Sequence, residues 1–225
     1  MPTFIDVLST DRFDTYLQWA NGDSDLGIRL YTFNTQLSAA LYAPLHMLEV
    51  ALRNATDQAL IIPYGTTWLD SPVALPHPYQ QDGVVKARRA LARDGKVETH
   101  SRLVAELTFG FWTSLYGRDA HHLWQHLRPI FKAKGVQRPL IAGQLRDLRM
   151  LRNRVAHYEP VLAQPLAQRY ASLTTLLGWL SPEAAAWVAR TSTWSTTYPA
   201  VPVLVPDAAG TLRIDPAVIS FLPTG

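Results

Sequence analysis

Hydrophobic residues recur every three or four positions along most of the chain, the spacing that places them on one face of an α-helix. The longest such run extends from Leu30 to Ala59, and the sequence Pro63-Tyr64-Gly65 that follows is typical of a helix end. Pro44 lies inside the run, and proline cannot donate the backbone hydrogen bond that a helix interior requires. We therefore predict a long helix that kinks or breaks at Pro44 and ends near Gly65.

Shorter runs with the same period predict the rest of a helical bundle. A first helix is expected around Phe13 to Ala20, behind capping residues at positions 9–11. Residues 63–83 lack the period and contain several prolines, so they are predicted to form a loop. Further helices are expected over residues 84–93, 103–117, 123–131, 140–158 and 166–180, and after Ser181, which precedes a proline and is suited to cap a helix.

The last segment of the chain, residues 191–225, has a different pattern. It is rich in Thr, Ser and Pro, and its best strand candidates are residues 201–205 and 218–222. No alternation of strands and helices is found elsewhere, which excludes an α/β class. We predict an all-α bundle over residues 1–190, with residues 191–225 as a short irregular or β-containing C-terminal appendage.

Composition narrows the class of protein. The 225 residues are 48% hydrophobic and 17% charged, which is typical of a globular chain. The absence of cysteine excludes disulfides, thiolate zinc sites and a cysteine nucleophile, and favours a reducing compartment. No secretory signal and no apolar stretch of roughly 20 residues is present, so we expect a cytoplasmic protein without a membrane segment.

Positive charge is concentrated in the second half of the chain. The net charge is only +3, but residues 118–169 contain many arginines and lysines against three acidic residues, Asp119, Asp147 and Glu159. A local excess of this kind suits the binding of phosphate groups.

The helix predicted over residues 140–158 carries the candidate chemistry. Its apolar seam is formed by Ile141, Leu145, Leu148 and Val155, and Arg152 occupies a position in that seam where an apolar residue is expected. A second stripe on the same helix contains polar and charged residues, namely Arg146, Arg149, Asn153 and His157. An arginine in an apolar seam is either a buried, ion-paired residue or a functional group that faces a cleft.

Arginine and histidine together suit the cleavage of RNA by phosphoryl transfer. His157 would exchange the proton of a ribose 2′-hydroxyl or of the leaving oxygen, and Arg152 would stabilise the phosphate in the transition state. Residues 152 and 157 are roughly 140° apart around an ideal helix, so either the helix is distorted or two copies of the chain form one composite cleft. The second case predicts a homodimer.

Three blocks of sequence carry a resemblance to a known family. The segment Arg152-Asn153-Arg154-Val155-Ala156-His157 resembles the HEPN signature, and its surroundings resemble the Abi-like (abortive infection) branch. The blocks at residues 45–55 and 106–112 are similar to that branch too, and the resemblance extends from about residue 31 to residue 190.

The resemblance implies a helical bundle that dimerises and, in active members, cleaves RNA without a metal. By position it implies that Arg152 and His157 are catalytic and that Asn153 assists them. We expect supporting roles for Arg149 and Arg154, and for Glu49 if it faces Arg152; otherwise Glu49 forms an ordinary helix pair with Arg53.

The sequence thus predicts a metal-independent endoribonuclease of toxin or phage-defence type. The expected partners are RNA, a second copy of the chain and an antitoxin or regulatory protein, with no cofactor, no metal and no membrane. Two alternatives stay open. In the first, the chain is a non-catalytic HEPN module that binds RNA, a nucleotide or a partner protein. In the second, it is a purely structural assembly protein in which Arg152 forms an ion pair and His157 caps a helix.

Overall fold

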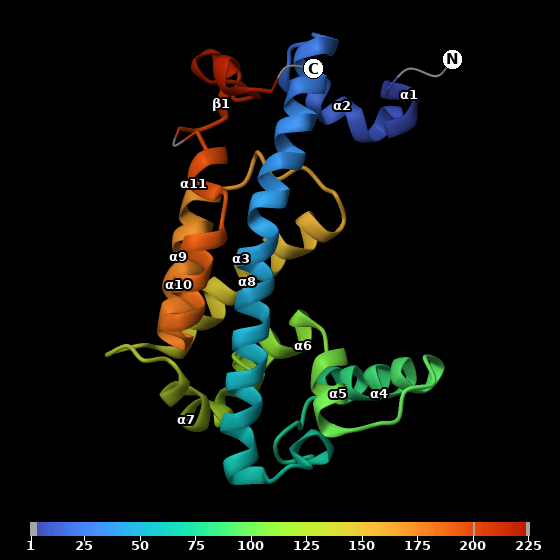
Figure 1. Ribbon diagram of the computed structural model, residues 1–225, viewed down its shortest axis with the longest axis vertical. Coiled ribbons are helices and arrows are strands. Elements are labelled where there is room, and N and C mark those ends of the chain that lie inside the picture. The colour runs from blue at the N-terminus through green and yellow to red at the C-terminus, as the bar shows by residue number, and fades with distance from the viewer. Residues whose placement is uncertain (1–3, 200, 224–225) are drawn as a thin grey trace. The chain divides into compact units, whose positions relative to one another are not determined.

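The computed structural model describes residues 4–199 and 201–223, and helices dominate it (Figure 1). The α-helices are α1 (Phe4–Leu8), α2 (Thr10–Trp19), α3 (Ser24–Tyr64), α4 (Pro78–Arg93), α5 (His100–Glu106), α6 (Phe109–Ser114), α7 (Trp124–Leu127), α8 (Arg138–Ala156), α9 (Leu166–Leu180), α10 (Pro182–Thr191) and α11 (Trp194–Thr197). Short 3₁₀ helices are η1 (Trp68–Asp70), η2 (Arg118–Leu123), η3 (Arg128–Ile130) and η4 (Pro216–Phe221). The strands β1 (Leu204–Pro206) and β2 (Leu212–Ile214) pair antiparallel, so the predicted all-α class with a small β-containing appendage is confirmed.

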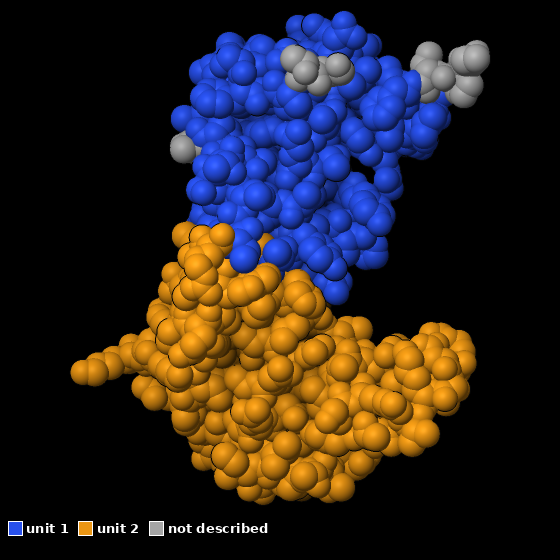
Figure 2. All heavy atoms as spheres, viewed as in Figure 1, with its two compact units in different colours: residues 1–43, 151–170, 191–225 blue, residues 44–150, 171–190 orange. Residues whose placement is uncertain are grey.

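The chain divides into two compact units, each assembled from segments distant in sequence (Figure 2). Unit 1 contains residues 1–43, 151–170 and 191–225, and unit 2 contains residues 44–150 and 171–190. Among the described residues, no helix has both the length and the apolar character needed to cross a membrane.

The core of unit 2 is aromatic at its centre. Trp68, Phe111 and Trp112 are almost fully buried and their rings contact one another, with centroids 5.1–6.4 Å apart. Asp57 is also buried, and its carboxylate accepts hydrogen bonds from Trp68 Nε1 (2.8 Å) and from His100 Nε2 (2.8 Å). Because a buried carboxylate is stabilised only when its oxygens have partners, these two bonds fix η1 and the start of α5 on α3.

Unit 1 encloses a separate core. Tyr16 of α2 is fully buried and makes edge-to-face contacts with Trp19 and Tyr31. Burial raises the pKa of Tyr16 well above its ordinary value, so this phenol stays neutral. The guanidinium of Arg29 donates to three backbone carbonyls near the C-terminus, those of Ile219, Leu222 and Pro223. These bonds attach the C-terminal appendage to α3 within unit 1.

The predicted interruption at Pro44 does not break the helix. Helix α3 runs for 41 residues through Pro44, and it ends at Tyr64 before Gly65, whose φ is +76°. The neighbouring residues Leu41, Leu45 and Leu48 are buried almost completely. Burial of apolar side chains at helical spacing outweighs the single backbone hydrogen bond that proline removes.

The helix predicted over residues 103–117 is in fact two helices. Helix α5 ends at Glu106 and α6 begins at Phe109, because the Thr108 side chain accepts a hydrogen bond from Phe111 N and caps the second helix. The apolar residues on both sides of Thr108 keep helical spacing, so the sequence pattern alone predicts one continuous helix through this threonine.

Other boundaries also differ from the sequence prediction. Helix α4 begins at Pro78 rather than residue 84, and residues 118–130 form short η2, α7 and η3 turns instead of one helix. In the appendage, β1 overlaps the first predicted strand, whereas residues 216–221 are a 3₁₀ helix and not a strand. The start of α10 is as predicted, since Ser181 Oγ accepts a hydrogen bond from Ala184 N.

Candidate functional site

Helix α8 ends immediately before His157, in a turn with well-defined geometry. Tyr158 has a left-handed conformation with φ +58°. Its backbone N–H donates to the Val155 carbonyl (3.3 Å), and the N–H of Glu159 donates to the Arg154 carbonyl (2.8 Å). This pair of bonds is the Schellman motif, which satisfies the free carbonyls at a helix end and makes His157 the C-cap residue. Helix α8 is therefore α-helical through Ala156 and ends at His157, and both a local distortion and a composite cleft stay predictions.

Side chains hold this turn in place within unit 1. Arg154 Nη1 lies 3.2 Å from a carboxylate oxygen of Glu159 and donates to the Pro160 carbonyl (3.4 Å). One residue further, the backbone N–H of Val161 donates to the side-chain oxygen of buried Asn34 (2.7 Å). The chain after α8 is thus tied back to α8 by Arg154 and to α3 by Asn34, and Arg154 supports the turn structurally.

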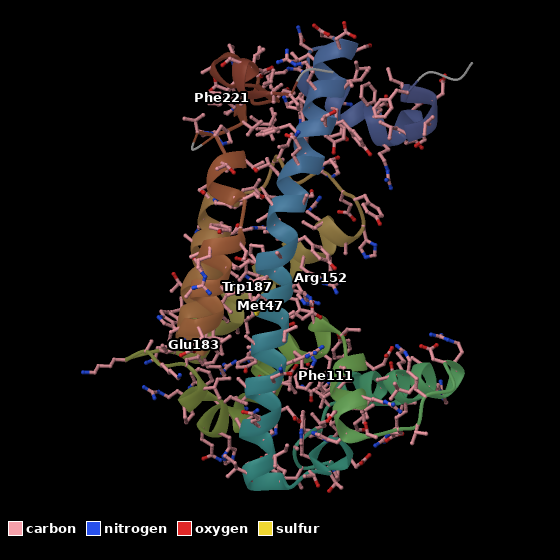
Figure 3. All side chains as sticks on the ribbon, viewed as in Figure 1. Met47, Phe111, Arg152, Glu183, Trp187 and Phe221 are labelled. Carbon is pink, nitrogen blue, oxygen red and sulfur yellow. The ribbon has the colours of Figure 1, made fainter. Side chains whose placement is uncertain are left out.

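The three predicted catalytic residues lie at this helix end with different exposure. Asn153 and His157 are exposed, whereas Arg152 is half-buried. Figure 3 labels the Arg152 side chain. An exposed imidazole can exchange a proton with a substrate, and exposed amide and guanidinium groups can donate hydrogen bonds to phosphate oxygens. The segment from Arg152 to His157, here called the RNA motif, presents a guanidinium, an amide and an imidazole, which are groups of the kind that metal-free phosphodiester cleavage uses.

The remaining predicted residues belong to unit 2. Glu49 is half-buried on α3, and Arg149 is half-buried on α8. The prediction that Glu49 holds Arg152 joins residues of different units and stays a prediction. Arg149 instead lines a pocket formed entirely within unit 2.

This pocket has a volume of about 690 Å³ and a strongly basic wall. Four arginines line it, and we call it the arginine pocket: Arg118, Arg138, Arg146 and Arg149. Tyr79, Thr113 and Ser114 add hydroxyl groups, and no acidic side chain is part of the lining.

Sequence reasoning did not find this pocket. Arg146 and Arg149 appeared in the polar stripe of α8, but Arg118 begins η2 and Arg138 begins α8, some 20 residues later. Tyr79 comes from α4, in a segment that the sequence predicted to be loop. The only signal was the excess of basic over acidic residues between positions 118 and 169, which indicates a positive region without specifying which residues meet.

The candidate metal ligands of the described residues do not cluster. No group of three or more His, Asp or Glu side chains is arranged to hold a metal ion there. No family model, no curated protein and no solved structure matches the chain.

Proposed function

We propose that the chain is a HEPN-type, metal-independent endoribonuclease of the toxin or phage-defence kind, with its active site at a homodimer interface. The observation that carries the proposal is the RNA motif itself. It combines a half-buried arginine with an exposed amide and an exposed imidazole at a helix end that Arg154 and Asn34 hold in place. The resemblance of three sequence blocks to the Abi-like family supports the same conclusion.

The proposed reaction is attack by a ribose 2′-oxygen on the adjacent phosphorus. His157 takes the 2′-hydroxyl proton as the 2′-oxygen bonds to phosphorus, and the bond from phosphorus to the 5′-oxygen breaks. The leaving 5′-oxygen receives a proton, and the products are a 2′,3′-cyclic phosphate and a 5′-hydroxyl. Arg152 stabilises the additional negative charge on the phosphate, and Asn153 orients it by hydrogen bonding.

Two copies of the RNA motif provide two imidazoles, one to accept the first proton and one to donate the second. A homodimer with the motif at a two-fold interface places both copies of the segment on one substrate strand. Since an activity of this kind is harmful to its own cell, an antitoxin or regulatory protein is the expected second partner.

The arginine pocket favours a second candidate function, that of a non-catalytic module that binds RNA or a nucleotide. Four arginines in one cavity suit phosphate binding whether or not RNA is cleaved. The two candidates are separated by whether bound RNA remains intact.

The test is cleavage of a defined RNA by the purified chain in the presence of EDTA. We expect wild type to cut, His157→Ala to be slower by about 10²–10⁴-fold and Arg152→Ala by about 10²–10³-fold. His121→Ala is the matched control, because His121 is an exposed histidine of unit 2 outside the RNA motif. A substrate with one 2′-deoxyribose at the cut site should resist cleavage there, which identifies the 2′-hydroxyl as the nucleophile.

The composite site has its own test. Mixing wild type with an equal amount of His157→Ala under conditions of subunit exchange should lower the activity to about half of that of the same wild type alone, because half of the wild-type chains then pair with a chain that lacks the second imidazole. A mixture that keeps the full activity of its wild-type chains would contradict the shared site. A folded, dimeric wild type that leaves varied RNAs intact would overturn the nuclease and leave the binding module.

A further inference from the structure

The arginine pocket gathers positive charge that its own wall does not neutralise. Among the described residues, Arg118, Arg138 and Arg149 form no ion pair with a carboxylate. Of the four arginines, Arg146 alone has a carboxylate partner: its Nε lies 3.4 Å from Asp147 Oδ1, and the two side chains are 65% and 45% exposed to solvent. An exposed pair of this kind contributes little screening, so a ligand with several negative charges would relieve the repulsion among the four arginines.

One arginine is already oriented and another lacks a partner. Arg138 Nη1 donates to the Tyr116 carbonyl (3.2 Å), which fixes the guanidinium and leaves its other N–H groups for a ligand. Tyr116 is itself fully buried, and its hydroxyl lies 2.6 Å from Thr56 Oγ1. Arg149 Nε is buried without a hydrogen-bond partner among the described residues. Buried polar atoms usually have a partner, so this N–H points to a missing acceptor.

The backbone adds a further attraction for anions. Arg138, Pro139, Ala142 and Gly143 all line the pocket, and they belong to the first two turns of the 19-residue helix α8. The start of a helix carries partial positive charge, and of these four residues only Arg138 has an N–H at a position without an intrahelical partner, because Pro139 has no N–H. Phosphate oxygens bind readily at such a position.

The side of the pocket formed by Tyr79 is suited to contact an aromatic ring of a ligand. Tyr79 is 52% exposed at the pocket, and its hydroxyl would lie 3.2 Å from a Cβ placed on Gly110. Arg149 Cδ lies 3.9 Å from the same Cβ position on Gly110. Because glycine has no Cβ, it leaves room at position 110 for the Tyr79 side chain beside Arg149. An exposed tyrosine ring offers a surface on which a nucleobase can stack. The volume of about 690 Å³ is within the range of small-molecule sites.

We propose that the arginine pocket binds a nucleotide that carries two or more phosphates, with the phosphates at the start of α8 and the base against Tyr79. Arg118, Arg138 and Arg149 hold the phosphate chain. The ligand is either a free nucleoside polyphosphate or the 5′-triphosphate end of an RNA, since both present the same group. The proposal does not rest on the nuclease function.

Calorimetric titration of the full chain, carrying His157→Ala so that RNA stays intact, tests the site. The probes are ATP, inorganic tripolyphosphate, adenosine, and one short RNA with either a 5′-triphosphate or a 5′-hydroxyl. We expect ATP and tripolyphosphate to bind, adenosine not to bind, and Arg138→Gln or Arg149→Gln to weaken ATP binding at least about tenfold. Tighter binding of the triphosphate RNA than of ATP would assign the RNA end as the ligand; the reverse order would assign the free nucleotide.

A charge-matched control separates a built site from general attraction. Arg93→Gln removes one positive charge from α4, where the Arg93 side chain is 78% exposed, and should leave ATP affinity unchanged. An equal loss with Arg93→Gln and Arg149→Gln would overturn the proposal. So would binding of adenosine as tight as that of ATP, or no binding of any phosphate probe by folded wild type. These results concern binding alone, so they are distinguishable from failure of RNA cleavage.

Discussion

The RNA motif of unit 1 and the arginine pocket of unit 2 present the same kinds of group in opposite ways. The RNA motif consists of neighbours in sequence, exposed at one helix end and held by a local turn. The arginine pocket combines residues from η2, the loop before it and the three helices α4, α6 and α8 of unit 2. The RNA motif can therefore be recognised in the sequence, whereas the arginine pocket becomes apparent only in the folded unit.

The difference in exposure between the two regions matches two different tasks, proton exchange with a substrate and binding of its phosphate groups. A reacting group must be exposed and free to exchange protons, which suits His157. A group that only binds phosphate gains from a fixed, partly desolvated donor, which suits Arg138 and Arg149. If each region has its own task, a substitution in one should leave the task of the other unchanged.

The largest expected effect is a loss of RNA cleavage rate without a loss of ATP affinity. His157→Ala is expected to slow cleavage of a 5′-hydroxyl RNA by about 10²–10⁴-fold, because the proton acceptor is lost, and to leave ATP affinity at the wild-type value. Arg138→Gln should instead reduce ATP affinity about tenfold, as measured by calorimetry. If Arg138→Gln slowed cleavage of that RNA as much as His157→Ala, the two regions would be one site.

The second prediction concerns the support of the pocket. Leu145 lies on α8 between the turns that carry Arg138 and Arg149, and it is completely buried. Leu145→Ala should lower the free energy of unfolding by about 2–5 kcal/mol, because it removes buried apolar contacts and leaves a cavity. Chemical denaturation monitored by tryptophan fluorescence measures this loss. Leu140→Ala, at a 49% exposed position of the same helix, is the control and should cost far less.

Most helices were predictable because the spacing of apolar residues and the capping side chains depend only on residues that are near one another in sequence. The spacing of Leu166 to Leu180 predicted α9 at its observed bounds, and Ser181 before Pro182 predicted the start of α10. The failures arose where tertiary contacts or a local cap decided the outcome. Buried leucines flank Pro44, where the predicted break does not occur, and Thr108 starts a new helix in the middle of an apolar run.

The candidate sites were predictable to a different extent. Arg152, Asn153 and His157 were visible as a motif because helical spacing and the nearby Pro160 place them together at one helix end. The arginine pocket was not, because it depends on how η2 and α4 pack against α8 within unit 2. The periodicity of one helix cannot show that Arg118 and the start of α8, 20 residues later, line the same pocket.

The third prediction tests how strongly the RNA motif depends on the chain behind it. Asn34→Ala removes the acceptor of the buried Val161 N–H, and an unpaired buried donor costs roughly 1–3 kcal/mol of unfolding free energy. Amide exchange at Val161 should accelerate, and RNA cleavage should fall while ATP binding is retained. Asn54→Ala, at an exposed asparagine on the same helix, should change none of these quantities. Unchanged exchange at Val161 would show that the Asn34 bond does not restrain the turn.

The smallest effect should have the opposite sign. Tyr158 adopts a left-handed conformation that costs a non-glycine residue roughly 1–2 kcal/mol. Its side chain is 74% exposed, so little packing is lost on removal. Tyr158→Gly relieves the strain but adds freedom to the unfolded chain, and a net stabilisation below about 1 kcal/mol is expected in thermal unfolding. Ala156→Gly, at the last residue of α8, should destabilise by a similar amount, because that position is helical. Cleavage that survives Tyr158→Gly would mean that the turn alone directs His157, whereas a loss of cleavage despite higher stability would make the phenol ring part of the RNA-binding surface.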